Sequence, residues 1–233
     1  MVPTSSSIKT IARFPWRSAI VALALLGLTT VIWPRSYSKF FLPLAGPGEI
    51  APLAMSGGSP HLRALMRTIS ASESNDKSPY TLFYGGTHFT DLSKHPDRCI
   101  KIVAGPNKNN CTTAAGRYQF INTTWDEKAR AYHPKPTKML MMWKHYSFEP
   151  IYQDKVVYTW LADNWVWDMD IQKSLEAGQV QRVFKRLSGT WTSLGYGIED
   201  NVVTPKLAKI YQRLLAEELA SAKNTAIPKP PEG

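Results

Sequence analysis

Residues 59–75 read SPHLRALMRTISASESN, and this stretch decides the fold. It opens with a serine followed by a proline, and a side-chain cap before a proline at the first helical position predicts a helix start. Apolar residues then recur at i, i+3, i+4 and i+7, namely Leu62, Leu65, Met66 and Ile69. Such spacing places them on one face of a helix. We therefore expect a helix that begins at Pro60, buries this stripe and ends before Asn75.

Glu73 falls in the last turn of this predicted helix, four residues after Ile69. That spacing places its side chain over the apolar stripe, at the end where the helix dipole is negative. Apolar surroundings and the dipole both favour the protonated carboxyl, and a carboxylic acid that keeps its proton can donate it to a departing sugar oxygen. The plain alternative is an ordinary glutamate on the solvent side of a frayed helix end.

The period of the apolar residues changes after Asn75. Residues 79–89 read as two short strands around the Gly85-Gly86 turn. Helical patterns return with a capping box formed by Thr124 and Glu127. Further helices are expected after Pro150, over residues 180–187 before Gly189, and from Thr204-Pro205 onward. The sequence predicts an α+β fold, mainly α, with one small early β-hairpin.

Several short motifs around Glu73 occur together in a fixed order. They are Ser72-Glu73, Tyr84-Gly85-Gly86, Phe89-Thr90-Asp91, His95-Pro96, Ala114 to Gln119, Trp125-Asp126, Trp191, Leu194 and Gly195-Tyr196-Gly197. In order and spacing, from Leu62 to about Leu215, this set resembles the bacteriophage lambda endolysin family. The resemblance implies a lysozyme-like fold and a lytic transglycosylase that acts on peptidoglycan glycan strands, with Glu73 as its catalytic residue.

The same resemblance implies which residues bind the glycan. The segment Gly116, Arg117, Tyr118 and Gln119 resembles the strip that lines the glycan cleft, and Ser72, Tyr84 and Tyr196 are further candidates. Arg117 suits the carboxylates of the wall polymer, or it pairs with Asp126. The glycines on either side of Tyr196 allow close backbone approach to a ligand, or they form a plain turn.

Hydrolysis by the common two-carboxylate route would need a second Asp or Glu about 5–10 Å from Glu73. Asp91 and Asp76 are the nearest candidates for that carboxylate, but Asp91 and Ser93 could simply fix a turn. A lytic transglycosylase does not need it, because the muramyl 6-hydroxyl attacks its own anomeric carbon. Transglycosylase is favoured on resemblance, with a hydrolytic muramidase and a non-catalytic wall-binding module as alternatives.

The N-terminal part differs in composition from the rest. Residues 18–33 contain no charge, follow Lys9, Arg13 and Arg17, and end at Pro34. They predict a signal-anchor within residues 1–41, with the catalytic domain in the periplasm or extracellular space; a cleaved, secreted form and a core helix are the alternatives. A Pro/Gly linker at 42–58, a catalytic domain at 59–223 and a flexible tail at 224–233 would follow.

Two cysteines, Cys99 and Cys111, are twelve positions apart and predict a disulfide if the chain is exported, or are two unrelated thiols. The net charge of +10 suits a polyanionic partner. No nucleic-acid-binding motif, metal-ligand spacing or cofactor fingerprint is present, so we expect neither nucleic acid, metal nor cofactor. No pattern fixes an oligomeric state.

Overall fold

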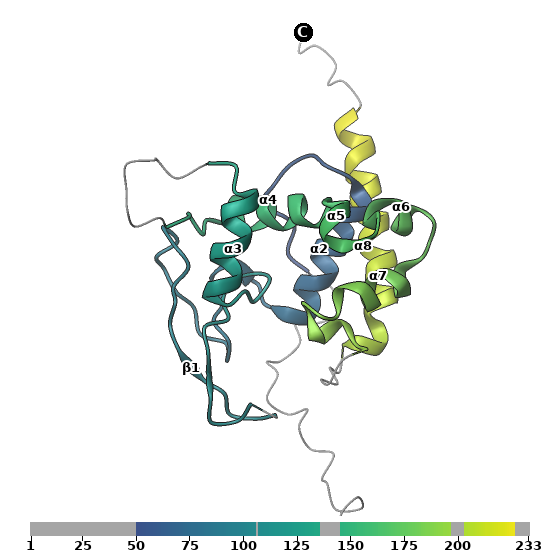
Figure 1. The fold of residues 1–233 in the computed structure, drawn as a ribbon. Helices are drawn as coiled ribbons and strands as arrows, with labels where there is room; N and C mark the ends of the chain where they lie inside the picture. The colour runs from purple at the N-terminus through teal and green to yellow at the C-terminus, as the bar shows by residue number, and fades with distance from the viewer. Residues whose placement is uncertain (1–49, 106, 136–144, 197–202, 227–233) are drawn as a thin grey trace, which may run out of the picture. The chain divides into compact units, whose positions relative to one another are not determined.

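The computed structural model describes residues 50–105, 107–135, 145–196 and 203–226. Its central element is α2 (Pro60–Glu73), which packs against α8 (Leu207–Ala226), α4 (Pro150–Leu161) and α6 (Ile171–Glu176) (Figure 1). The four residues of the predicted stripe are fully buried. The helix starts at the predicted proline and ends at Glu73, but Ser59 makes no side-chain cap. Its backbone N–H instead donates to the Tyr158 hydroxyl.

The remaining helices are short. They are η2 (Pro79–Thr81), α3 (Asn122–Tyr132), α5 (Asn164–Trp167), α7 (Val180–Leu187), η3 (Thr192–Leu194) and η4 (Thr204–Lys206). Of these, η3 also packs against α2. The predicted capping box is wrong, because α3 starts at Asn122 and thus contains both Thr124 and Glu127. The Asn122 side chain accepts the Thr123 N–H, and its backbone N–H donates to Thr113 Oγ1.

The sheet lies later in the chain than the sequence predicts. Residues 79–81 form η2, and one bridge, Leu82 to His88, spans the Gly85-Gly86 turn. The two-stranded antiparallel sheet is made by β1 (Ile100–Lys101) and β2 (Cys111–Thr112). The predicted disulfide between Cys99 and Cys111 closes this hairpin, with the two Cα atoms 5.4 Å apart. The α+β, mainly α class is confirmed, but the predicted hairpin at 79–89 is reduced to a bridged turn.

Aromatic rings fill the centre of the domain. The Phe120 ring lies near four other aromatic rings, whose centroids are 6.0 to 6.4 Å from its own. These rings belong to Tyr118, Trp125, Trp160 and Trp191. The Trp160 and Trp167 rings are 4.9 Å apart, and Trp167 Nε1 donates to Trp160 O. Large rings supply much buried apolar area. Packing of the core therefore accounts for most of the aromatic residues of the chain.

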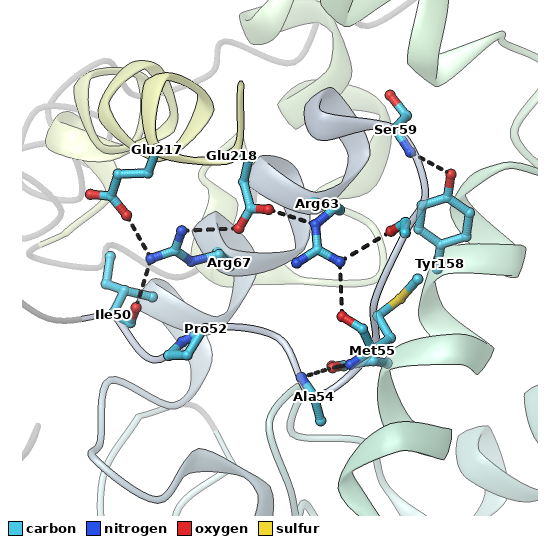
Figure 2. A network of polar contacts seen from close by, with 12 residues as sticks. Ile50, Pro52, Ala54, Met55, Ser59, Arg63, Arg67, Tyr158, Glu217 and Glu218 are labelled. Atoms are coloured by element: carbon cyan, nitrogen blue, oxygen red, sulfur yellow. Dashed lines mark hydrogen bonds and ion pairs between the residues drawn. The ribbon is translucent and has the colours of Figure 1, made fainter. Parts of the chain in front are cut away.

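Residues 50–58 precede α2 and are held against the domain by arginines. Arg67 Nη2 donates to Ile50 O, and Arg63 Nη1 donates to the carbonyls of Met55 and Gly57 (Figure 2). Glu218 on α8 accepts from both arginines. The described part of the predicted linker is therefore a fixed part of the fold.

Within the described ranges, no helix is both long and apolar enough to cross a membrane. The predicted anchor at residues 18–33 lies outside these ranges. At the other end, α8 continues through Ala226, so the first residues of the predicted tail are helical.

Candidate active site

Glu73 is the last residue of α2 and is half-buried. Its carboxylate oxygen Oε1 is in hydrogen-bond contact with the hydroxyl of Ser193, which lies in η3. Two segments 120 residues apart therefore meet at this carboxyl. Ser193 is buried, so the contact is shielded from bulk water and electrostatically stronger than it would be on an open surface.

The Ser193 hydroxyl has a second partner, Ser72 Oγ, at 2.9 Å. Ser72 Oγ in turn lies 2.9 Å from the carbonyl oxygen of Ile69. Each hydroxyl carries one proton and can also accept a hydrogen bond. The hydrogen bonds along this row of oxygens can therefore run in either direction. With Glu73 protonated, protons point from Glu73 to Ser193, from Ser193 to Ser72, and from Ser72 to the carbonyl. With Glu73 ionised, Ser72 donates to Ser193 and Ser193 donates to Glu73.

The end of α2 is fixed to the segment 116–119 by Ser74. Its hydroxyl lies 2.6 Å from Arg117 O, and its backbone N–H continues the helical pattern by donating to Ser70 O. Ser74 is buried. The backbone that carries Glu73 is thereby tied to the turn that the sequence assigns to the glycan cleft.

The structure places Arg117 and Tyr118 in the interior, not on a surface. Arg117 donates to the carbonyls of Ala51 and Pro52 and to the Tyr80 hydroxyl, and Tyr118 donates to Asp154 Oδ1. Both residues are almost completely buried. Burial, together with the Asp154 charge, raises the pKa of the Tyr118 phenol, which keeps it a neutral donor. These partners of Arg117 do not include Asp126, the alternative partner that the sequence offers.

Gly116 and Gln119 shape the turn between these two buried side chains. Gly116 has a φ of +75°, and a Cβ there would lie 2.4 Å from Gln153 Oε1 and 2.7 Å from the Phe148 ring. Glycine is therefore required for packing. The half-buried Gln119 donates from Nε2 to Leu82 O and Gly116 O. Both residues hold the local backbone in place.

The remaining predicted site residues differ in exposure. Tyr196 is 57% exposed with its hydroxyl on Gln181, and Tyr84 is half-buried. Ser72 is buried, and its hydroxyl lies 2.9 Å from that of Ser193, which contacts Glu73. Asp91 is exposed, and hydrogen bonds from the Ser93 side chain and then from the Ser93 backbone N–H to Oδ1 lower the pKa of its carboxyl. These contacts form the turn that the plain interpretation of Asp91 predicts.

Sequence reasoning missed Ser193 and the buried carboxylate of Asp154. Asp154 Oδ2 accepts from Ala54 N, Met55 N and the Tyr80 hydroxyl at 2.6, 3.1 and 2.7 Å. A lone aspartate inside a helix carries no signal for such a role. Ser193 lies between Trp191 and Leu194, both in the motif set, so its position in that motif was the available signal. Among the described residues, no group of three or more His, Cys, Asp or Glu side chains could hold a metal ion.

Comparison with known proteins assigns the chain to a protein family. The family model described as Endolysin matches residues 63–217. The endolysin of Escherichia phage lambda is 27% identical over 133 residues, which covers 56% of this chain and 72% of that protein. A solved structure of bacteriophage lambda lysozyme in complex with a chitohexasaccharide superposes with a TM-score of 0.50 at 23% identity, over 69% of this chain and 97% of the other, and thus supports the fold. The family match includes Glu73, Ser193 and the segment between them, and on that match the chain belongs to the Endolysin family.

Proposed function

We propose that this chain cleaves the β-1,4 bond between N-acetylmuramic acid and N-acetylglucosamine in peptidoglycan, as a lytic transglycosylase with Glu73 as acid and base. Membership of the Endolysin family supports a peptidoglycan-degrading glycosidase of lysozyme type. The observation that carries the assignment to Glu73 is its half-buried carboxyl at the end of α2, in contact with a hydroxyl that has a second partner.

The reaction uses the two protonation states in turn. Protonated Glu73 donates to the glycosidic oxygen as the bond to the muramyl anomeric carbon breaks, and the N-acetylglucosamine side leaves as an alcohol. Ionised Glu73 then accepts the proton of the muramyl 6-hydroxyl while that oxygen bonds to the same carbon. The products are a 1,6-anhydromuramyl end and a regenerated carboxylic acid, and no water is consumed.

The Ser193–Ser72 hydroxyl row supports this alternation. It can accept the Glu73 proton before substrate binds, a contact that breaks when this proton passes to the glycosidic oxygen, and it can donate to the ionised carboxylate afterwards. A group that changes charge during a reaction is best served by an environment that is already arranged for both states.

Hydrolysis to a reducing end is the second candidate outcome. It would use Asp91 as the second carboxylate, which is ionised at neutral pH but already occupied in a turn with Ser93. Water would replace the 6-hydroxyl as the nucleophile. The two outcomes differ in product mass by one water molecule, so they can be distinguished directly.

The test is digestion of purified peptidoglycan by the wild-type chain and by Glu73→Gln. We expect 1,6-anhydro muropeptides from the wild type in mass spectra and a loss of at least about 100-fold in rate for the variant. Glu176→Gln, at an exposed glutamate on α6, should retain full activity and controls for the charge change. Equal rates for wild type and Glu73→Gln would exclude Glu73, and hydrated products would favour the muramidase.

We further propose that residues 18–33 tether the chain to a membrane with the catalytic domain on the side where disulfides persist. The apolar run and the Cys99–Cys111 disulfide both support export. Fractionation of expressing cells, followed by protease treatment of intact spheroplasts, tests this. A soluble chain that is protected from external protease would contradict it.

A further inference from the structure

Trp165 lies on the four-residue helix α5 and is 92% exposed. It is the most exposed large apolar side chain in the described ranges, and its neighbour Val166 is 48% exposed. An indole left in water is costly relative to burial. A tryptophan in such a position, beside another apolar side chain, is typical of a surface that binds a partner.

The helix that carries Trp165 is held at both ends. Asp163 Oδ1 accepts the backbone N–H groups of Trp165 and Val166, and the Tyr132 hydroxyl donates to the other oxygen of Asp163. Two residues after Trp165, buried Trp167 is anchored to Trp160 on α4. The backbone under the indole is thus fixed before any ligand arrives, which lowers the entropy cost of binding.

A hollow of about 280 Å³ lies beside the indole, lined by Asn164, Trp165, Asp168, Met169 and Asp170. This volume is close to the lower end of roughly 300–1,000 Å³ that is typical of small-molecule sites. Its wall combines an aromatic face and a thioether with carboxylate and amide groups. The Asp168 side chain is 94% exposed, with Arg186 Nη2 3.8 Å from Oδ2.

We infer that Trp165 and this hollow form a second glycan-binding site, which takes an uncharged N-acetylglucosamine unit of the same polymer that the chain cleaves. The apolar face of the pyranose ring stacks on the indole, and the ring hydroxyls donate to the carboxylates of Asp168 and Asp170. This inference rests on the proposed function, because the polymer is the substrate proposed for Glu73. The site would keep the enzyme on an insoluble strand between cleavage events.

The charges around Trp165 favour a neutral sugar over the other occupants. Three aspartates, Asp163, Asp168 and Asp170, lie within five residues of Trp165 on either side. Two cations pair with them, Lys173 with Asp170 and Arg186 with Asp168. This balance does not attract an anionic lipid surface, which recruits clusters of lysine and arginine. The carboxylates also repel the acidic peptide stem that a muramyl unit carries on its lactyl group, so the N-acetylglucosamine unit is the better fit.

The site is separate from Glu73. In Figure 1, α5 lies towards the top of the view and the end of α2 that carries Glu73 lies towards the bottom. The residues that line the hollow all fall between 164 and 170, whereas Glu73 at the end of α2 contacts Ser193 in η3. A glycan on Trp165 therefore does not occupy the position of the bond that is cleaved.

The experiment compares full-length Glu73→Gln with Glu73→Gln/Trp165→Ala in co-sedimentation with purified insoluble peptidoglycan. We expect the second substitution to weaken binding about fivefold to tenfold. Because the side chain is exposed, its removal should leave the unfolding temperature unchanged. Trp165→Phe should keep part of the affinity, and Val103→Ala, at an apolar residue that is 54% exposed elsewhere, should bind like the parent.

A titration with chitohexaose gives an independent readout. The indole Nε1–H resonance that disappears in Trp165→Ala should shift when chitohexaose is added to the Glu73→Gln chain. Unchanged co-sedimentation and an unmoved resonance would overturn the inference, even where Glu73→Gln is inactive and the proposed function stands. Conversely, weaker binding by Trp165→Ala with a fully active Glu73→Gln would remove the proposed mechanism and leave the site. A Trp165→Ala effect on binding to phosphatidylglycerol vesicles or on oligomeric state, without an effect on peptidoglycan, would also overturn it.

Discussion

The hydrogen bonding of the Glu73 carboxyl depends on the Ser193 hydroxyl. This hydroxyl is the link between the carboxyl and Ser72, so Ser193→Ala leaves Glu73 without that donor and acceptor. A hydrogen bond to a charged group contributes about 1.5–3 kcal/mol, which corresponds to roughly a 10- to 150-fold loss in rate. We expect kcat to fall in this range with KM little changed, as measured by release of soluble muropeptides.

Ser188→Ala is the matched control for this substitution. Like Ser193, Ser188 is buried and its hydroxyl is hydrogen-bonded. Its partner is the backbone carbonyl of Lys185, to which it donates, and it has no contact with Glu73. A similar loss of kcat in both variants would show that the effect of Ser193→Ala is on stability alone.

His95 makes the stability of the domain depend on pH. The Asp97 N–H donates to Nδ1, so Nδ1 is unprotonated and Nε2–H donates to Phe120 O at 2.8 Å. Burial lowers the pKa of the imidazole below 6.5. Below pH 6.5 the unfolded chain therefore binds a proton that the folded chain does not, and stability falls as pH falls.

The expected slope from His95 is at most about 1.4 kcal/mol per pH unit below pH 6.5. Urea unfolding at pH 8, 6 and 5 measures it. His95→Gln should be less stable at pH 8 but should show a flatter pH dependence, whereas His145→Gln, at an exposed histidine, should keep the wild-type slope. An unchanged slope in His95→Gln would contradict this account.

Substitution of Arg117 distinguishes a substrate-binding role of this residue from a structural role. If the residue holds the fold, Arg117→Met removes the Arg117 donors from two backbone carbonyls and from the Tyr80 hydroxyl. Removing one partner of a buried charged network costs about 3–5 kcal/mol. We expect a large drop in unfolding free energy in urea, with kcat/KM close to wild type at a temperature where the variant remains folded. A loss of kcat/KM without a loss of stability would restore the substrate-binding interpretation.

At the scale of elements, the hairpin of β1 and β2 depends on a covalent link. The strands pair over only two residues each, and a two-stranded hairpin of this size is marginal in water by itself. The Cys99–Cys111 loop should contribute about 3 kcal/mol in the chain-entropy model. Reduction, or Cys99→Ser/Cys111→Ser, should lower the unfolding free energy by about that amount, while an unchanged value would mean that the hairpin opens before the domain unfolds.

Helices with local start and stop signals were predictable, and elements that depend on distant partners were not. Pro60, Pro150 and Val180 begin helices where the pattern places them. The strands at 79–89 were predicted from a local turn signal, but Phe83 bridges Ala115, and Ala115 in turn bridges Phe120. Ala115 is 32 residues after Phe83, so the local pattern around the turn does not specify this pairing.

At the scale of the whole molecule, the candidate site was also predictable only where local sequence patterns determine it. Glu73 was predictable because the apolar stripe of α2 places it, and the disulfide because of cysteine spacing. Arg117 and Tyr118 were predicted from resemblance to line the glycan cleft, yet their side chains point into the core to meet Asp154 and residues 51–55. Which side of a turn is buried depends on chain segments that no local pattern identifies.

The segment that buries them leads to a prediction about where the folded domain begins. The family match starts at residue 63, but residues 50–58 supply the carbonyls that Arg117, Arg67 and Arg63 bind, and the two N–H groups that Asp154 binds. Leu53 and Met55 are also buried, each contributing about 1.5–3 kcal/mol. Loss of these contacts and of the charge partners is comparable to the whole stability of a domain, about 5–15 kcal/mol.

A chain shortened to begin at residue 50 retains all of these contacts and should therefore fold cooperatively. A chain that begins at residue 59 should not fold cooperatively at 25 °C, although it retains α2, Glu73 and every predicted glycan-binding residue. Circular dichroism melting of the two shortened chains measures the difference, with peptidoglycan digestion as a second readout. Equal melting temperatures would mean that residues 50–58 lie on the domain without stabilising it, and that the buried arginines find other acceptors when the segment is absent.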